Sequence, residues 1–217
     1  MPWEMKPVTI AESSLIEAFL DLYQSCDYRE ITVGQIVDKA GYSRGTFYKY
    51  FDSKEDILLK LAYRTVPWNL IETTMREIST VPLEDATDRV IGYFEKRSSL
   101  VRLLLQSPVS DEYLTLIYNA AKPLYRGLVE RAYDMDPYLL DFFAERICVT
   151  KGLLLRHWAL KDNSYSLRQL NKIEESLIES SFWSRIAMQA PKHGGPKERI
   201  RIEDVSLDYP WIDDNHI

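Results

Sequence analysis

The sequence predicts an all-α protein in which an N-terminal three-helix domain with a helix-turn-helix precedes a larger helical domain. Apolar residues recur at the spacing of amphipathic helices along most of the chain. Several helix-capping patterns follow one another near the N-terminus, and the chain beyond Pro67 has no notable strand pattern. Hydrophobic residues make up 46% of the 217 residues and aromatic residues 12%, which is enough for a real core and excludes a disordered chain.

The first two helices are each expected to begin after a threonine with capping-box spacing. Thr9 is followed three residues later by a glutamate, and an amphipathic run then continues to about Cys26. Thr32 stands three residues before Gln35 in the same way. Gly41 follows the second run as the left-handed residue that often ends a helix. We therefore expect a helix of about 17 residues followed by one of about 8.

Two further helices follow after short connections. Ser43 is placed to cap a helix over Arg44–Tyr50, and Ser53 is placed to cap the next one. Only residues 41–43 connect the second and third helices. Two short helices joined by so tight a glycine-containing turn form a helix-turn-helix, centred here on Ile31–Phe51.

Beyond Pro67 the periodicity predicts a helical domain interrupted by prolines. The expected helices are Trp68–Ser79, Glu84–Arg97, Ser99–Gln106, Asp111–Tyr133, Tyr138–Lys161 and Ser166–Met188. Pro123 lies inside one of them and is expected to kink it or split it. The tail from Pro191 is either disordered or an extended arm that docks through its large apolar residues. The predicted domains are therefore residues 1–66, residues 67–190 and a tail of residues 191–217.

Charge is distributed unevenly along the chain. The formal net charge is −6, but residues 39–54 contain four basic residues and one acidic residue. A basic patch on an acidic body is typical of a protein that meets DNA on one side. A local excess of this size is also common on any solvated helix, so it supports a DNA partner only together with a motif.

The third expected helix has two different sides. Phe47, Tyr50 and Phe51 are spaced to face inward. The outward residues are Arg44, Thr46, Tyr48 and Lys49. Arginine can bind guanine or phosphate, while tyrosine and threonine can reach a thymine methyl group or a phosphate, so this side suits the major groove of DNA. Tyr48, like Tyr50, could also lie in the core, and ordinary solvation is the alternative for Arg44 and Lys49.

Glycines and helix starts add further candidate DNA contacts. Gly34 and Gly45 each lower helix propensity by roughly 1 kcal/mol. We therefore expect a close approach of another helix at Gly34 and of DNA at Gly45. Helix N-termini bind phosphate, which predicts that Thr32, Ser43 and Lys54 position the DNA backbone. Thr32 is a helix cap in either case.

The string AGYSRGTFYKYF, together with its spacing to Thr32 and Ser53, resembles the DNA-binding region of the TetR family of bacterial regulators. The resemblance covers about Thr9 to Arg64, and the rest of the chain is similar only in being helical. Carried over by position, it implies DNA contacts from Thr32, Ser43, Arg44, Thr46, Tyr48, Lys49 and Lys54. One departure is that only Lys6 stands where family members often have several basic residues, which speaks against an N-terminal arm on the DNA.

The resemblance also implies a homodimer and a small-molecule effector. Family members pair their last two long helices between subunits, which here are Tyr138–Lys161 and Ser166–Met188; an internal amphipathic hairpin is the alternative. The expected effector contacts, among the middle helices, are Tyr93, Arg97, Tyr118, Tyr125, His157 and Trp158. Core or surface placement is the alternative for each of them, and for His157 it is that of a core histidine with satisfied hydrogen bonds.

The expected function is that of a cytoplasmic transcription regulator, most simply a repressor. It would bind a palindromic operator in double-stranded DNA as a homodimer, under the control of a small-molecule effector. The alternative is a helical interaction module of the same fold that does not bind an operator. Nothing in the sequence names the effector, and repression and activation both stay open.

Enzymes and membrane proteins are not expected. The chain has none of the common hydrolase, phosphate-binding-loop or metalloprotease motifs, so we expect no catalytic site, cofactor or metal. Cys26 and Cys148 lack metal-ligand spacing and are expected to be free, buried thiols. No apolar run is long enough to span a membrane.

Overall fold

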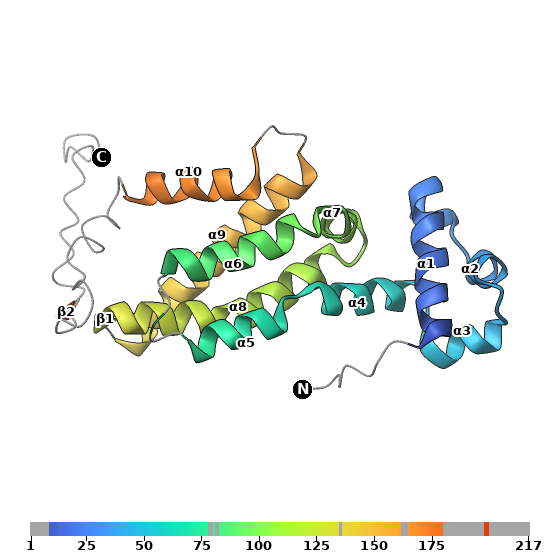
Figure 1. Ribbon diagram of the computed structural model, residues 1–217, viewed down its shortest axis with the longest axis horizontal. Helices are drawn as coiled ribbons and strands as arrows, with labels where there is room; N and C mark the ends of the chain where they lie inside the picture. The colour runs from blue at the N-terminus through green and yellow to red at the C-terminus, as the bar shows by residue number, and fades with distance from the viewer. Residues whose placement is uncertain are drawn as a thin grey trace, which may run out of the picture. The chain divides into compact units, whose positions relative to one another are not determined.

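The computed structural model describes residues 9–77, 80, 83–134, 136–161, 165–179 and 198–199. Within these residues the chain is almost wholly α-helical, as Figure 1 shows, and the predicted all-α fold class is confirmed. The helices are α1 (Ile10–Ser25), α2 (Val33–Ala40), α3 (Arg44–Tyr50), α4 (Lys54–Thr65), α5 (Trp68–Arg76), α6 (Leu83–Glu95), α7 (Ser98–Gln106), α8 (Ser110–Ala132), α9 (Pro137–Leu160) and α10 (Leu167–Glu179). A short 3₁₀ helix, η1 (Tyr28–Glu30), lies between α1 and α2.

The chain forms two compact units that are discontinuous in sequence. The first combines residues 1–67 with residues 96–117, and the second combines residues 68–95 with residues 118–217. The first boundary lies close to the predicted one at residue 66. Residues 96–117 join the first unit because α7 packs against α4. The sequential division into 1–66, 67–190 and 191–217 stays a prediction, since most of the tail lies outside the described residues.

The predicted caps form at the helix starts of the first unit. In each case a hydroxyl oxygen accepts the backbone N–H three residues on: Thr9 from Glu12 (3.2 Å), Thr32 from Gln35 (3.3 Å), Ser43 from Thr46 (3.1 Å) and Ser53 from Asp56 (3.3 Å). Such a cap stabilises a helix by about 1 kcal/mol because it satisfies an otherwise unpaired N–H group. Gly41 ends α2 with φ 74°, the left-handed conformation predicted for it.

The core of the first unit lies where α1, α2 and α3 pack on one another. These three helices are grouped together in Figure 1. The fully buried side chains among them include Leu15, Phe19, Ile36 and Phe47. Each helix thereby buries one face, which supplies most of the stability that such short helices lack on their own.

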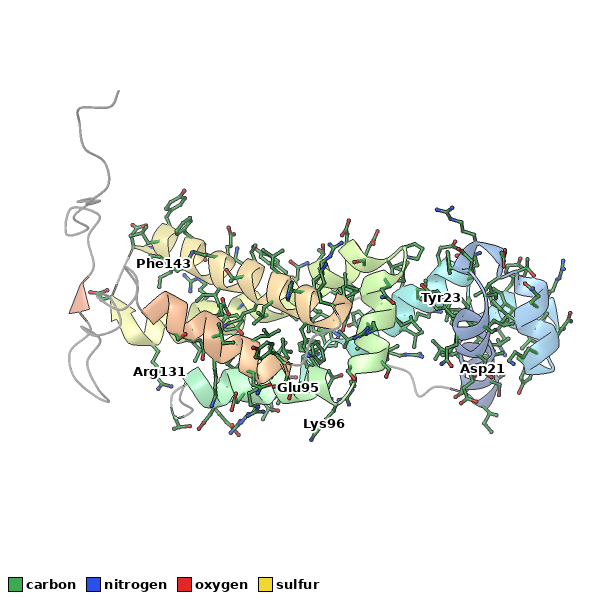
Figure 2. The ribbon with its side chains drawn as sticks, turned by 90° about the horizontal axis from the view of Figure 1, so that it is seen from above. Asp21, Tyr23, Glu95, Lys96, Arg131 and Phe143 are labelled. Carbon is green, nitrogen blue, oxygen red and sulfur yellow. The ribbon has the colours of Figure 1, made fainter. Side chains whose placement is uncertain are left out.

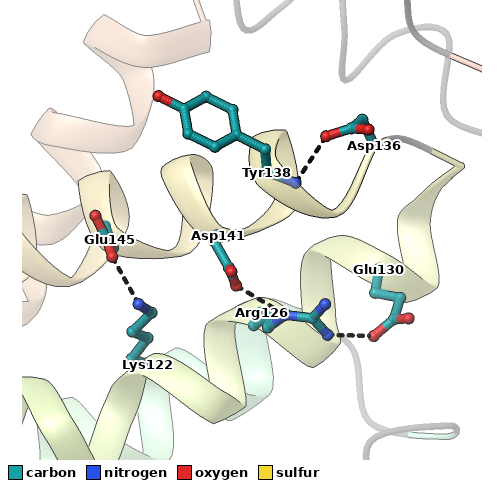
Figure 3. Close-up of polar contacts among 7 residues, drawn as sticks. All are labelled: Lys122, Arg126, Glu130, Asp136, Tyr138, Asp141 and Glu145. Carbon is teal, nitrogen blue, oxygen red and sulfur yellow. Dashed lines mark hydrogen bonds and ion pairs between the residues drawn. The ribbon is translucent and has the colours of Figure 1, made fainter.

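In the second unit, α8 and α9 run side by side and are joined by ion pairs, shown in Figure 3. The Lys122 ammonium lies 2.6 Å from the Glu145 carboxylate, and the Arg126 guanidinium lies 2.9 Å from Asp141. Phe143 of α9, marked in Figure 2, is buried in an apolar cluster with Leu140. Exposed ion pairs contribute little free energy, so burial of α9 is the larger stabilising effect.

Three features of the second unit correct or refine the sequence expectations. Helix α8 continues through Pro123, so the helix is not split there. Its flanking residues Leu124 and Tyr125 are buried, and that burial offsets the backbone hydrogen bond that proline cannot donate. Two-residue strands, β1 (Tyr133–Asp134) and β2 (Glu198–Arg199), pair in parallel where no strand was expected. The predicted capping box at Ser166 is confirmed, since Ser166 and Gln169 bond each other's backbone N–H groups.

Helix ends differ slightly from the predicted ones. Helix α5 ends at Arg76, and α10 is described to Glu179, so the expected continuation to residue 188 lies outside the described residues. No helix in the described ranges is both long and apolar enough to span a membrane.

Candidate nucleic-acid interface

Helix α3 has the two predicted sides. Phe47 is fully buried, and Phe51, which caps the end of the helix, is 1% exposed. Tyr48 stands between them in sequence with 58% of its surface exposed. Tyr50 is half-buried, so it belongs fully to neither side. The Phe47 ring contacts the rings of Tyr48 and Phe51 within α3 and its C-cap, and the burial of Phe47 and Phe51 holds the helix against the core.

The outward side of α3 carries groups that suit a DNA surface. Arg44, Gly45 and Lys49 are exposed, and Thr46 is half-buried. Among the described residues the Arg44 guanidinium makes no hydrogen bond or ion pair, so its five N–H donors stay available. The Lys49 ammonium lies 5.6 Å from the centre of the Tyr50 ring. This side therefore presents two cations and a phenol to solvent.

The hydroxyl groups at the starts of α2 and α3 are already engaged in capping. Thr32 and Gln35 form a reciprocal capping box, in which the Gln35 Oε1 accepts the Thr32 N–H at 2.7 Å. The Ser43 hydroxyl lies 3.1 Å from the Thr46 hydroxyl. Both Thr32 and Ser43 remain exposed, so each can meet a phosphate while it holds the first turn of its helix.

Lys54 has a role that the sequence did not reveal. Its ammonium donates to the backbone oxygens of Tyr28, at 2.7 Å, and of Ile31, at 2.8 Å, and lies 4.3 Å from the centre of the Tyr28 ring. Burial raises the pKa of Tyr28 well above its usual value, and the neighbouring Glu55 carboxylate raises it further. Lys54 thus connects the start of α4 to η1, and the expected phosphate contact from its ammonium stays a prediction.

Lys60 is a further structural residue that sequence reasoning missed. Its ammonium donates to the Tyr50 backbone oxygen, lies 3.3 Å from the Asp56 carboxylate and stands over the Phe51 ring. It therefore binds the C-terminal end of α3 from α4, where the partial negative charge of a helix end favours a cation. The partners are too far along the chain for local spacing to have indicated this contact.

The two glycines have different surroundings. A Cβ atom added at Gly34 would lie 3.2 Å from the Arg44 guanidinium. We expected another helix to approach Gly34 closely, but the close neighbour is the Arg44 side chain of the next helix. Among the residues that the structure describes, a Cβ atom at Gly45 would have only the Ser43 hydroxyl near it, at 3.7 Å. The protein itself leaves space at Gly45, and the expected approach of DNA stays a prediction.

The six expected effector contacts do not all fall in one unit. Arg97 lies in the first unit, and the other five lie in the second. Tyr125 is buried, whereas Tyr93, Tyr118 and Trp158 are half-buried. His157 is exposed in the last turn of α9, so the alternative of a core histidine is wrong. The apolar run around it had suggested burial, and Leu155 and Ala159 are indeed buried, but Leu153, one turn before His157, is exposed.

A polar cluster inside the second unit was not predicted. Lys151 of α9 donates to Asn171 and to Glu174 of α10, both at 2.6 Å, and Asn171 is buried. Desolvation raises the pKa of Tyr125, whose hydroxyl is beside Thr87. A lysine two residues before the apolar run at residues 153–155 was the available sequence signal. Lys151 and Glu174 are both needed in this ion pair, because an unpaired, largely buried charge would be costly.

The cysteines are free thiols, as expected. Cys148 is buried, but Cys26 is only partly buried, which corrects the prediction for that residue. The described residues contain no group of three or more histidine, cysteine or acidic side chains that could hold a metal ion.

An exposed, partly basic helix held by a tight turn defines a helix-turn-helix of the DNA-binding class. Residues 15–61 match the family model described as "Bacterial regulatory proteins, tetR family". The HTH-type dhaKLM operon transcriptional activator DhaS from Lactococcus lactis subsp. lactis (strain IL1403) is 41% identical over 54 residues, which are 25% of this chain and 29% of that protein. Within residues 15–61 this chain thus matches the tetR family of bacterial regulatory proteins, and the region matched to DhaS spans less than a third of that relative's length.

Solved structures extend the likeness in fold to the rest of the chain. The fatty acid degradation regulator FadR from Bacillus halodurans has a TM-score of 0.58 at 20% identity, over 80% of this chain and 96% of that one. A TetR transcriptional regulator from Streptococcus agalactiae 2603V has a TM-score of 0.55 at 21% identity, over 77% and 93%. Thermus thermophilus FadR, a TetR family repressor solved with lauroyl-CoA, has a TM-score of 0.51 at 21% identity, over 85% and 98%. The chain therefore has the fold of TetR-family regulators.

Proposed function

We propose that this protein is a transcription regulator that places α3 in the major groove of an operator. The observation that carries the proposal is the division of α3, with Phe47 in the core and Tyr48 and Arg44 exposed beside it. Side chains of these exposed types bind base edges and phosphates. Gly45, Thr46 and Lys49 complete the contacts from α3, and Thr32, Ser43 and the start of α4 at Lys54 position the DNA backbone through helix N-termini.

The proposed assembly is a homodimer that pairs through α9 and α10. Helix α9 exposes Tyr138, Phe142, Val149 and Leu153. Their spacing places them on one face of the helix. Ile173 of α10 is also exposed. An unpartnered apolar stripe on a long helix favours a protein partner, and a two-fold pair would present two α3 helices to half-sites about 34–36 Å apart on a palindromic operator.

Control by a small molecule is the third part of the proposal. Tyr93, Tyr118, Tyr125, Trp158 and His157 of the second unit are the candidate effector contacts, with Arg97 of the first unit as a separate one. An effector that binds one conformation of the dimer better shifts the population toward it. Repression is the proposed direction, because a dimer on its operator blocks access to the DNA. A thermal-shift screen that begins with acyl-CoA esters, the ligand class seen in the Thermus FadR structure, tests this part.

A mobility-shift titration on DNA flanking the gene, repeated across salt concentrations, tests the proposed function. Arg44→Ala is expected to weaken operator binding by about 1–3 kcal/mol, and more than it weakens binding to random DNA. Lys49→Ala is expected to lower the salt slope by about one unit because it removes one phosphate contact. Arg76→Ala, on an exposed arginine of α5, is the matched control and should change neither.

Two outcomes would contradict the proposal in different ways. Equal loss of operator and random DNA binding in Arg44→Ala would make Arg44 a phosphate contact. The absence of any salt-sensitive shift on flanking fragments would favour the alternative, a helical interaction module of the same fold that does not bind an operator.

A further inference from the structure

Gly34, in the first turn of α2, leaves a space that the Arg44 side chain uses. A Cβ atom at Gly34 would lie 3.2 Å from Arg44 Nη2, closer than ordinary van der Waals contact, and 3.7 Å from the Thr32 hydroxyl. Among the described residues no other atom outside the local chain lies within 4 Å of that position. The space is therefore occupied by the guanidinium of the following helix, and close packing of two helix backbones does not account for the glycine.

The backbone at Gly34 does not require a glycine. Gly41 is the glycine with a positive φ in the described part of the chain, so Gly34 has a conformation that alanine adopts readily. Alanine is also the better helix former. Gly34 therefore lowers the stability of the helix and is not required by the backbone conformation. The feature that needs a residue without a Cβ atom at this position is the Arg44 side chain.

The position of the guanidinium matters because Arg44 is the residue of α3 best suited to read a base. The guanidinium lies beside the first turn of α2, at a place that a Cβ atom at position 34 would crowd. Its N–H donors are not used by the described residues. A guanidinium with free N–H donors can bind guanine O6 and N7 in a bidentate manner.

We infer that Gly34 is a specificity-determining residue, which makes room for the Arg44 guanidinium so that it reads a guanine in each half-site. This inference rests on the proposed function and adds to it the base that is read and the residue that positions its reader. A side chain at position 34 displaces the guanidinium by a few tenths of an ångström or more and relaxes the preference for guanine at that base pair.

The experiment compares base preference in a double-mutant cycle. The probe is the duplex that the wild-type protein enriches from a random-sequence DNA pool, synthesised with each of the four bases at every half-site position. Wild type, Gly34→Ala, Arg44→Ala and the double variant are titrated by fluorescence anisotropy. Gly92→Ala is the matched control, because it lies in α6, outside the proposed DNA and dimer contacts, and its added Cβ would lie at an ordinary 3.6 Å from the Arg168 guanidinium.

Wild type is expected to prefer guanine at one position by about tenfold or more, within the range of a good bidentate pair. Gly34→Ala is expected to lose most of that preference while it binds random DNA normally and unfolds at the same temperature or higher. The double variant should retain the same base preference as Arg44→Ala alone. If Gly34 acts through Arg44, its substitution has no further effect once Arg44 is removed, so the two effects are non-additive. Gly92→Ala should match wild type.

The contradicting results are distinct from failure of the proposed function. Full guanine preference in Gly34→Ala, or additive losses in the double variant, would overturn the role of Gly34 and leave DNA binding intact. A lowered unfolding temperature in Gly34→Ala would make Gly34 a packing residue and also overturn it. A wild type that enriches no sequence from the pool would overturn both the inference and the proposed function.

Discussion

Phe47 and Tyr48 are neighbours in α3, but Phe47 is buried and Tyr48 is exposed. Substitutions at the two positions therefore distinguish a role in folding from a role in binding. Phe47→Ala is expected to lower the free energy of unfolding by about 3–5 kcal/mol, because it empties a fully buried site. Tyr48→Ala should change it by less than about 0.5 kcal/mol, since its ring is largely exposed. Urea unfolding followed by circular dichroism measures both. Equal losses in the two variants would show that Tyr48 is a core residue.

Cys148 is expected to be unreactive although it is not in a disulfide. Burial raises the pKa of its thiol to about 12 from 9.0, so the nucleophilic thiolate is rare at neutral pH. The folded protein holds this proton more tightly than the unfolded chain does. The free energy of unfolding is therefore higher at neutral pH than at high pH, and it falls as the pH rises from about 9 towards 12. Iodoacetamide labelling with mass spectrometry should modify the partly exposed Cys26 first and both cysteines alike in urea. Equal rates in the native protein would contradict this.

Residue roles were predictable where both partners are close in sequence. Thr9, Thr32, Ser43 and Ser53 cap helices as expected, because a capping hydroxyl and its N–H lie three residues apart. Lys54 binds oxygens 26 and 23 residues away, and such pairs follow from tertiary packing alone. His157 was misjudged for a related reason, since a histidine within an apolar run still lies on whichever face the helix exposes.

The turn between α2 and α3 depends on one backbone conformation. Gly41 has φ 74°, where a Cβ atom costs about 1–2 kcal/mol. Gly41→Ala is therefore expected to lower the free energy of unfolding by roughly that amount, and Gly41→Asn by less. Gly92→Ala is the opposite case, a helix-interior glycine whose added Cβ would make an ordinary contact at 3.6 Å with Arg168, and it should stabilise by about 0.5–1 kcal/mol. Thermal unfolding of the three variants measures this, and a neutral Gly41→Ala would contradict the assigned turn.

At the scale of elements, helices were predictable and their interruptions were not. The 3.6-residue periodicity and the caps located each long helix, because these signals repeat or are local. Pro123 did not split α8, since burial of the neighbouring residues outweighs one missing hydrogen bond. The short η1 and the paired β1 and β2 contain two or three residues each, too few for a periodic pattern.

The organisation of the whole molecule was the least predictable from the sequence. Residues 96–117 belong to the same compact unit as residues 1–67, although a long stretch of chain separates them. Contact between α4 and α7 produces this grouping, and no local pattern indicates which helix of one segment packs on which helix of another. The outward side of α3 was predictable because its burial pattern is set within seven residues.

The exposed face of α9 predicts the oligomeric state. Leu153 is 63% exposed on that face, and Leu153→Glu is expected to place a charge in the proposed interface. Light scattering after size-exclusion chromatography should give twice 25.4 kDa for wild type and a single 25.4 kDa chain for the variant. Ile10→Glu, on an apolar residue of α1 that is 84% exposed, is the control and should stay dimeric. A monomeric wild type would contradict the interface.

Helix α3 is proposed to read DNA from the major groove, and methylation interference on the enriched duplex distinguishes this from minor-groove binding. Methylation of guanine N7 blocks the major-groove edge, whereas methylation of adenine N3 blocks the minor groove. Wild type is expected to lose binding when a half-site guanine is methylated at N7, and Arg44→Ala is expected to become insensitive to that same modification. Interference confined to adenine N3, or an identical pattern in wild type and Arg44→Ala, would contradict the account.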